Sequence, residues 1–576
     1  AEFAAETPYF YSTYSAAGSP PEAAPVGRPA ALVIGSGPVR IGQGIEFDYC
    51  AVQAADTLRR AGWNAIMINS NPETVSTDFD ASSRLYFEPL DPESVRNVID
   101  AETGAGDELL PIVVAYGGQT PLNLAAPLSA AGVALLGSDL EAIDQAEERT
   151  RFSALLDRLG IPQPEGGMAH SVEEALTLAE RIGYPVIVRP SFVIGGLAID
   201  FCYSASDLTR QLAAATVVDP DRPVRIDRYL EGVEVDIDAV SDGERVLIPG
   251  LLEHVERAGV HSGDSVGMFP PQTVSDGDQA LIVSTMERIV LALGARGLVN
   301  AQFIVRDDGV YLIEVNPRAS RTVPFMSKVT GVPMVELAVR ISLGATLPEL
   351  GWDGGHLPPP SFVAVKAPAF STAKLRGVDP SVGPGMQSTG EVIGIHEDPR
   401  VALAKALLGA ALVPPRPDAS GALALLSIAD RDKALLPRLA EALVGAGYRM
   451  AATPGTRAAL AEAGHDSMPV AKLGEAVDDD SGDVPILDLI ASGDVRLVVN
   501  TPTPRSGAVR DAAEIRLAAT AEGILCLTAM ETAVAAAEAL DPGLRARLFE
   551  VRTLAEWVPA DQPCRHATVE DPVAAI

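Results

Sequence analysis

The stretch that decides the fold reads NAQFIVRDDGVYLIEVNPRASRT and runs from Asn300 to Thr322. Two apolar, β-branched runs flank the polar segment 306–309 (RDDG), a pattern typical of an antiparallel hairpin with a short glycine-containing loop. The sequence therefore predicts two paired strands, and the side chains on their shared face indicate what the chain binds.

The polar side chains of this hairpin are expected on one face. Alternate residues of a strand share a face, so Glu314 and Asn316 should point one way and Ile313 and Val315 the other. With one bulged residue at the turn, Gln302 would lie opposite Glu314. A carboxylate and two amide oxygens are hard ligands suited to Mg²⁺ or Mn²⁺. An ordinary hairpin with a solvated polar face is the alternative that spacing leaves open.

The length and charge of the chain limit its class. A chain of 576 residues is too long for one core and predicts roughly three or four domains. There are 44 Lys plus Arg against 77 Asp plus Glu, a net charge of −33, which argues against non-specific binding to nucleic acid or to anionic membranes. No apolar run reaches the roughly 18 residues of a membrane span, and no secretory signal begins the chain.

Cysteine usage indicates the compartment. Four cysteines are scattered without CxxC spacing: Cys50, Cys202, Cys526 and Cys564. They form neither a zinc motif nor a disulfide framework, so we predict a reducing cytoplasm. The first residue is Ala, and we expect a piece excised or processed from a longer chain.

The N-terminal part predicts a small doubly wound domain over residues 30–140, after a tail and linker at 1–29. Three buried strands are expected within it at 30–35, 64–69 and 112–116, each followed by a polar loop and a helix. The loops 71–78 and 117–120 should gather at the carboxyl ends of the strands, where such sheets bind ligands. Helix capping by Glu73, Thr74 and Gln119 is the alternative.

Residues 141–350 change pattern. A buried strand over 185–188 leads to Arg189 and then to the Gly195-Gly196 loop, which could close over phosphates with its backbone N–H groups. Further on, Glu234, Asp236 and Asp238 share one face of a strand. This is either a solvated acidic face or, for Glu234, a ribose contact.

Two histidines follow this acidic strand, and they do not indicate a metal. His254 and His261 are too far apart for a zinc pair on one element, and local hydrogen bonding accounts for them.

Seven long motifs in register resemble the ATP-grasp ligases and, more narrowly, the large subunits of carbamoyl-phosphate synthase. They are IGQGIEFDY (Ile41–Tyr49), NPETVSTD (Asn71–Asp78), YGGQTPLNL (Tyr116–Leu124), VRPSF (Val188–Phe192), VEVDIDA (Val233–Ala239), EHVERAGVHSGDS (Glu253–Ser265) and LIEVNPRASRTVPF (Leu312–Phe325). Large subunits of this family are internally duplicated, and the order here is similar to their C-terminal half.

The resemblance implies an α/β and α+β multidomain fold: a pre-ATP-grasp domain (30–140), an ATP-grasp domain (141–350), a cap and linker (351–418) and a Rossmann-like regulatory domain (419–576). Within 351–418 only 388–394 and the following helix are expected to be ordered. The implied activity is phosphorylation of carbamate by ATP to give carbamoyl phosphate, for pyrimidine and arginine biosynthesis.

The resemblance also implies a set of site residues. Gln302, Glu314 and Asn316 match metal positions for two Mg²⁺ or Mn²⁺ ions, with K⁺ as a further candidate, and Glu314, Asn316 and Arg318 would be catalytic. Arg318 would steady the transferred phosphoryl group with its planar fork. Nucleotide-contact positions are Arg149, Arg189, Arg228, Leu230, Glu234, Gly259, Val260, His261, Ser262, Gln302 and Glu314. No nucleophile is required.

The region 419–576 resembles a methylglyoxal-synthase-like regulatory domain with a pocket for a nucleotide effector. Its matching positions are Thr453, Gly455, Thr456, Lys472, Asn500, Thr501 and Thr503. Turn residues at strand ends are the alternative. The family's partners are a glutaminase small subunit and the N-terminal synthetase half, to which we expect this chain to dock.

The sequence departs from the family pattern in three places. Leu197 stands where an Arg usually follows the paired glycines. Ala367 replaces a glutamate of the ornithine site, although Glu256 and Asp264 remain. Gly385 and Gln387 replace a Glu and an Arg. These departures keep two rivals open: a structural and regulatory half with weak catalysis, and another ATP-grasp carboxylate ligase.

Overall fold

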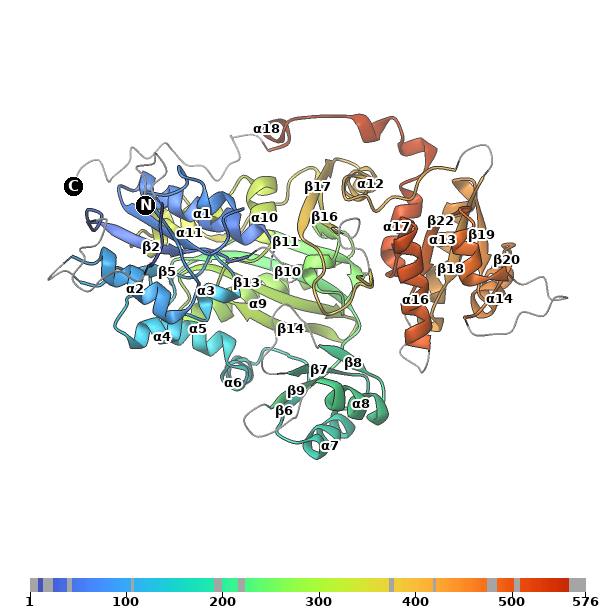
Figure 1. The fold of residues 1–576 in the computed structure, drawn as a ribbon, viewed down its shortest axis with the longest axis horizontal. Coiled ribbons are helices and arrows are strands. Elements are labelled where there is room, and N and C mark those ends of the chain that lie inside the picture. The colour runs from blue at the N-terminus through green and yellow to red at the C-terminus, as the bar shows by residue number, and fades with distance from the viewer. Residues whose placement is uncertain are drawn as a thin grey trace.

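The computed structural model describes residues 9–13, 24–38, 44–104, 108–190, 199–215, 223–371, 378–417, 421–473, 484–501 and 508–558. These residues form four sheets with helices packed around them. Figure 1 shows the N-terminal sheet beside a large central sheet, a small sheet next to β14, and the C-terminal sheet beyond β16 and β17.

The N-terminal sheet is parallel, with strand order β1-β4-β3-β2-β5. Its strands are β1 (Tyr9–Phe10), β2 (Ala30–Ile34), β3 (Asn64–Asn69), β4 (Arg84–Phe87) and β5 (Ile112–Val113). Helices α1 (Glu46–Arg60), α2 (Pro92–Glu102), α3 (Gln119–Leu122), α4 (Ala125–Ala130) and α5 (Leu140–Glu147) and the turn η1 (Val75–Thr77) accompany it. Every residue of β2 is buried, as expected for a strand covered on both faces. The edge strand β1 lies within the segment that we expected to be a tail.

The central sheet has the order β14-β13-β10-β11-β12-β16-β17, with β15 paired to β11. Its strands are β10 (Val233–Ser241), β11 (Val246–Arg257), β12 (Gly267–Phe269), β13 (Gly297–Arg306), β14 (Gly309–Asn316), β15 (Gly355–His356), β16 (Val363–Ala369) and β17 (Gly390–His396). Around it are α9 (Asp276–Leu293), α10 (Thr322–Thr330), α11 (Met334–Ser342), α12 (Pro399–Gly409), η2 (Ser262–Asp264) and η3 (Pro348–Leu350).

Two faces of the central sheet have different roles. Val235 and Ile237 of β10 pack with residues of α9 in one apolar core, whereas the intervening acidic residues face the other way. Strand β16 corrects the sequence-based expectation, because we had predicted an irregular linker there. Its apolar residues are buried between β12 and β17, so the sheet continues beyond residue 350.

The small antiparallel sheet has the order β6-β9-β7-β8. It consists of β6 (Gly166–Ala169), β7 (Val186–Pro190), β8 (Asp200–Cys202) and β9 (Val224–Arg228), with α6 (Arg149–Leu159), α7 (Val172–Ile182) and α8 (Ala205–Ala215). In both views it lies beside β14.

The C-terminal sheet is parallel, in the order β21-β20-β19-β18-β22-β23. Its strands are β18 (Ala422–Ser427), β19 (Tyr448–Ala452), β20 (Met468–Ala471), β21 (Val484–Pro485), β22 (Val495–Asn500) and β23 (Leu525–Leu527). The helical elements are η4 (Asp430–Leu435), α13 (Leu436–Gly445), α14 (Pro454–Glu462), α15 (Ile486–Ala491), α16 (Ala508–Ala521) and α17 (Met530–Glu538).

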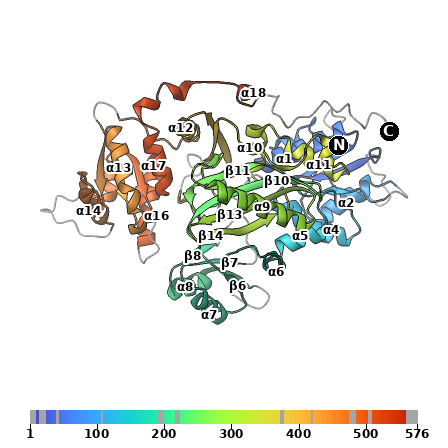
Figure 2. The same cartoon turned by 180° about the vertical axis from the view of Figure 1, so that it is seen from behind.

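The chain then crosses back over the central sheet through η5 (Pro542–Leu544), η6 (Arg547–Phe549) and α18 (Leu554–Trp557), as Figure 2 shows from behind. The ring of Trp557 meets that of Phe362 edge-on at 5.7 Å between centroids. This return ties the C-terminal unit to the rest of the molecule. No described helix is long and apolar enough to cross a membrane.

Cysteines within the described residues are free thiols. Cys50, Cys202 and Cys526 make no disulfide, and burial raises the pKa of each; for Cys202 and Cys526 the pKa is about 12. Cys564 lies outside the described residues.

Candidate nucleotide and metal site

The hairpin β13–β14 places the predicted metal ligands together. Gln302 pairs with Glu314 as predicted, and Asn300 pairs with Asn316. The extra residue lies at Ile313 within β14, where the register shifts, and not at the turn. The predicted face of Ile313 is therefore wrong: the residue packs against a small cluster containing Leu230, on the site side of the sheet.

Hydrogen bonds orient the amide groups of this set. Nε2 of Gln302 donates to Oγ of Ser262 at 2.9 Å. Nδ2 of Asn316 donates to Oε1 of Glu314 at 3.1 Å, and Oδ1 of Asn316 accepts from Arg318 at 3.3 Å. Each amide nitrogen is thus committed to the protein, and the Asn316 oxygen is also oriented, by Arg318. The set fits a hard divalent ion by its donor chemistry.

Positive charge surrounds Glu314. Burial raises the pKa of its carboxyl group, but Arg149, Arg189 and Arg318 and the hydrogen bond from Asn316 outweigh burial, and the pKa is lowered from its ordinary value. Glu314 is therefore ionised at neutral pH. Arg189 is half-buried, and its buried Nε has no hydrogen-bond partner among the described residues. A guanidinium with an unused donor is suited to a phosphate oxygen.

The acidic strand β10 is not a solvated face. Glu234, Asp236 and Asp238 are all buried, which rules out that alternative. Asp236 accepts a hydrogen bond from Nε2 of His254 at 3.1 Å, and Nδ1 of His254 lies 3.9 Å from Glu234. Burial raises the pKa of Glu234 to about 7 despite the opposing effect of His254.

Asp238 holds the start of α10 against the sheet. Its carboxylate accepts from Oγ of Ser320 at 2.7 Å, from the hydroxyl of Thr322, and from Nδ2 of Asn300 at 3.0 Å. Asn300 in turn lies 3.4 Å from Nδ2 of Asn316. Sequence reasoning missed this polar support, although the SRT triplet after Arg318 carries its signal.

The segment 259–262 forms one border of the site. Gly259 has a φ of +111°, and a Cβ there would lie 2.8 Å from the Phe201 ring, so glycine is required. Burial lowers the pKa of His261, and its Nδ1 accepts from the Gly263 amide at 3.0 Å. The histidine is therefore neutral. Val260 lies beside it in an isolated bridge with Ala258.

An apolar patch adjoins these polar groups. Leu230, Ala258 and Ile304 are buried together, and Tyr311 and Ile313 pack against them. Leu230 therefore lies in an apolar patch next to the segment 259–262, and its contact with an adenine stays a prediction. The side chain of Arg228 is exposed, at the end of β9, so the structure does not bring it into this patch.

The loops of the N-terminal sheet are organised around Asn69. Its Oδ1 accepts from the Gly37 amide at 2.9 Å, and its Nδ2 donates to Thr74 and Ser76. Thr74 precedes η1 without a side-chain capping bond, so helix capping is not its role. Gln119 donates to Glu147 at 3.2 Å, and Glu73 is exposed.

The predicted effector pocket is a cavity of about 250 Å³ in the C-terminal sheet. It is lined by the predicted Thr453, Gly455, Thr456, Lys472, Asn500 and Thr501. Thr503 lies outside the described residues. Sequence reasoning missed Ser427, Asp430 and Lys433, which also line it; the lysine just after strand β18 was the available signal.

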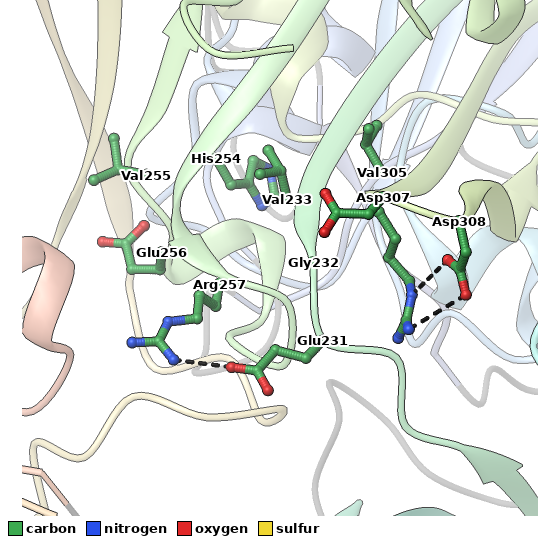
Figure 3. A pocket seen from close by; sticks show the side chains of 11 residues that line it. Glu231, Gly232, Val233, His254, Val255, Glu256, Arg257, Val305, Asp307 and Asp308 are labelled. Atoms are coloured by element: carbon green, nitrogen blue, oxygen red, sulfur yellow. Dashed lines mark hydrogen bonds and ion pairs between the residues drawn. The ribbon is translucent and has the colours of Figure 1, made fainter. Parts of the chain in front are cut away.

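A larger cavity of about 450 Å³ opens at the ends of β10 and β11 and at the hairpin turn (Figure 3). Four of its eleven lining residues are acidic, and its two arginines are already paired. Arg257 donates to Glu231 at 2.8 Å, and Arg306 donates to Asp308 at 2.9 Å. The cavity therefore offers no unpaired guanidinium to a phosphate.

The residues of the family's ornithine site are engaged with protein groups. Glu256 accepts from Thr532 of α17 at 2.5 Å and from the Val266 amide at 2.8 Å. Asp264 accepts from the amides of Gln387 and Ser388, both at 2.8 Å. Ala367 is fully buried beside them in β16 and carries no charge. Within the described residues, no contact of Gly385 explains why it replaces the family's glutamate. Leu197, like Gly195 and Gly196, lies outside the described residues.

Comparison with known protein families covers most of the chain. Residues 27–145 match the carbamoyl phosphate synthase preATP-grasp domain, and residues 148–350 match the ATP-binding domain of the carbamoyl-phosphate synthase L chain. Residues 436–528 match the MGS-like domain.

A curated relative is similar over nearly the whole chain. The carbamoyl phosphate synthase large chain of Thermomicrobium roseum is 52% identical over 542 residues, which is 94% of this chain and 49% of the relative. The chain thus spans about half the length of that relative.

Solved structures share the fold at low identity. The biotin carboxylase domain of 2-oxoglutarate carboxylase from Hydrogenobacter thermophilus, in complex with MgADP and bicarbonate, has a TM-score of 0.51 and 19% identity, covering 66% of this chain and 89% of that one. The ADP complex of N5-carboxyaminoimidazole ribonucleotide synthetase has a TM-score of 0.50 and 12% identity, covering 66% and 96%.

The fold and the family matches define a protein of the ATP-grasp class that carries an MGS-like domain, and the predicted fold class is confirmed. The chain belongs to the carbamoyl phosphate synthase large-chain family, as its motifs indicated.

Proposed function

We propose that this chain phosphorylates carbamate with ATP to give carbamoyl phosphate and ADP, as the second half-reaction of glutamine-dependent carbamoyl phosphate synthesis. The observation that carries the proposal is the hairpin register: Gln302 opposite Glu314, with Asn316 beside it and arginines around it, in a chain of this family. Pyrimidine and arginine biosynthesis would use the product.

In this proposal the protein positions its substrates and forms no covalent intermediate with them. Gln302, Glu314 and Asn316 would hold divalent cations, which, when bound, neutralise charge across the β- and γ-phosphates of ATP. Arg149 and Arg189 would contact phosphate oxygens, because both act on the charge of Glu314 and Arg189 retains an unused donor. Glu234 would accept the ribose hydroxyls, and Leu230 would face the adenine.

Arg318 would steady the transferred phosphoryl group. Its Nη1 and Nη2 are oriented by the Ala319 carbonyl and by Asn316, and its guanidinium lies 6.0 Å from the centroid of Phe47 in α1. Its Nε is buried without a hydrogen-bond partner among the described residues. The acceptor site would therefore lie where the central sheet meets the N-terminal sheet.

The proposal includes partners and boundaries. An N-terminal synthetase half and a glutaminase small subunit would supply carbamate, K⁺ would be an additional ion, and the chain would work in the cytoplasm. A nucleotide effector would occupy the 250 Å³ cavity.

We propose units at 30–140, 141–350, 351–418 and 419–576, with the third unit contributing β16 and β17 to the sheet of the second.

The test is ATP synthesis from ADP and carbamoyl phosphate with Mg²⁺, since carbamate itself is labile. Glu314→Gln should lower the rate by at least about a hundredfold, because the main anionic ligand is lost. Asp308→Asn is the matched control, a carboxylate exposed at the turn of the same hairpin, and should leave the rate unchanged.

No ATP from the folded wild-type chain would refute the proposal. It would favour a structural and regulatory half with weak catalysis, for which the uncharged Ala367 is the supporting observation. ATP formation with acetyl phosphate in place of carbamoyl phosphate, at an equal rate, would favour a different carboxylate ligase.

A further inference from the structure

A buried lysine contacts the segment 259–262, which borders the proposed nucleotide site. Lys366 of β16 is 0% exposed. Its Nζ donates to the backbone carbonyl of Ser262 at 2.9 Å. Strand β16 places it there by pairing Lys366 with Gly267 of β12 on one side and with Ile393 of β17 on the other. The residue lies beyond the segment 148–350 that matches the family's ATP-binding domain.

Ser262 connects this lysine to the candidate metal ligands. Its carbonyl oxygen accepts from Lys366, and its hydroxyl oxygen accepts from Nε2 of Gln302 at 2.9 Å. This hydrogen bond fixes the orientation of the Gln302 amide, so that its nitrogen faces Ser262 and not the proposed cation. The position of Ser262 therefore determines where the Gln302 oxygen points relative to Glu314, its partner across the hairpin.

The charge of Lys366 is supported and not simply tolerated. Nζ lies 3.6 Å from Oε1 of Glu391 in β17. Burial raises the pKa of Asp236, but His254 and, to a smaller extent, the Lys366 ammonium outweigh it and hold that pKa below its ordinary value. Keeping an ion pair buried is costly, and an apolar side chain of similar volume is often as stable or more stable. Packing alone therefore does not explain a lysine at this position.

We propose that Lys366 is a positioning residue for the metal site, acting through Ser262 on the amide of Gln302. The inference deepens the proposed function and rests on it for the role of the metal. Partners that orient metal ligands typically contribute on the order of 10- to 100-fold in metal affinity. The specific expectation is that removing the ammonium weakens metal binding more than it weakens nucleotide binding.

The test measures Mn²⁺ binding to the full chain in the presence of ADP, from the free Mn²⁺ signal in electron paramagnetic resonance, and ADP binding without metal by calorimetry. Lys366→Met should raise the Mn²⁺ dissociation constant by about tenfold or more, with less than about a twofold change for ADP alone. Lys405→Met is the matched control. Its Nζ also donates to a backbone carbonyl, that of Glu550 at 2.7 Å, but on α12 away from the site. The control should change neither constant.

Ser262→Ala separates positioning from general stability. It deletes the hydroxyl that Gln302 uses and leaves Lys366 in place, and it should reproduce the loss of Mn²⁺ affinity. The double variant Lys366→Met/Ser262→Ala should lose little more, because both act on one route. If Lys366→Met does not fold, Ser262→Ala decides: unchanged Mn²⁺ affinity there overturns the proposal.

Unchanged Mn²⁺ affinity in a folded Lys366→Met variant would also overturn it, as would an equal loss in Lys405→Met. The two proposals fail separately. A wild-type chain that makes no ATP from carbamoyl phosphate, yet loses Mn²⁺ affinity in Lys366→Met, would refute the function and support the positioning role.

Discussion

Nδ2 of Asn316 donates to Oε1 of Glu314 at 3.1 Å, so two predicted metal ligands of one strand hold each other in place. This hydrogen bond satisfies one oxygen of the Glu314 carboxylate and leaves its negative charge in place. It also turns the amide oxygen of Asn316 toward Arg318, which donates to it at 3.3 Å. The hairpin therefore orients these oxygens through hydrogen bonds of its own.

Asn316→Asp should make the fold depend on metal. A carboxylate in place of the amide loses the hydrogen bond and adds like-charge repulsion next to Glu314, which costs roughly 1–3 kcal/mol. Mg²⁺ would relieve that repulsion. We expect the melting temperature to fall clearly without Mg²⁺ and to recover with it, while the wild type changes little. An equal fall in both conditions would contradict the assignment.

Nucleotide binding should strengthen as pH rises through about 7, the pKa to which burial raises Glu234. The ionised carboxylate accepts hydroxyl donors, and its population rises roughly tenfold between pH 6 and pH 8 for such a pKa. Calorimetric ADP affinity should increase accordingly over that range. Glu234→Gln should flatten the profile; a slope that persists in the variant would point to another group, with His254 the nearest.

The same shift predicts a pH dependence of stability. Because the folded pKa of Glu234 is raised, its ionised form is disfavoured in the fold. Its contribution to stability should therefore decline as pH rises from the ordinary value of 4.5 through about 7. Urea unfolding should show a smaller decline for Glu234→Gln than for the wild type across this window. Identical pH profiles would contradict the shift.

Two ion pairs that join α1 to Arg321, just before α10, and to Glu336 of α11 should differ in strength. Glu46 pairs twice with Arg321, at 3.1 and 3.2 Å, and both side chains are buried. Arg60 pairs with Glu336 at 3.1 Å on the surface. Glu46→Ala should cost about 3–5 kcal/mol by leaving a buried guanidinium short of its partner. Arg60→Ala should cost about 0–1 kcal/mol. Urea unfolding of both variants provides the comparison; equal costs would refute it.

Lys433 should contribute to ligand binding in the C-terminal cavity. Its Nζ pairs with Asp430 at 2.7 Å, and both residues line the cavity. A phosphate would compete with that exposed aspartate for the ammonium. Lys433→Met should weaken the binding of inorganic phosphate or a nucleoside monophosphate by about tenfold in calorimetry, and Lys405→Met should not. Equal binding by wild type and Lys433→Met would remove the residue from the site.

Local patterns predicted the hairpin well. The apolar alternation and the glycine loop sufficed to pair Gln302 with Glu314. The same reasoning misplaced the bulge, because the backbone shift at Ile313 depends on packing against Leu230, which is distant in sequence. The burial of Asp236 could not be predicted from local sequence either, since its partner His254 comes from the neighbouring strand.

Strand β16 shows why the remainder could not be read from local sequence. VAVKAPA contains a lysine and a proline, which obscure the strand pattern. The strand exists because β12 and β17 pair with it on both sides. Lys366 gave no local signal for the same reason. The carbonyl that it contacts belongs to Ser262, which lies 104 residues earlier in the chain.

Sheet continuity, more than family boundaries, sets the smallest piece of this chain that keeps the central sheet complete. A fragment ending at residue 350 would keep the hairpin and lose β15, β16 and β17. Strand β12 would then present unpaired backbone groups, a template for association with other chains. Domain swaps or truncations made within this family are therefore better placed after α12, near residue 417, than at the edge of the ATP-binding match.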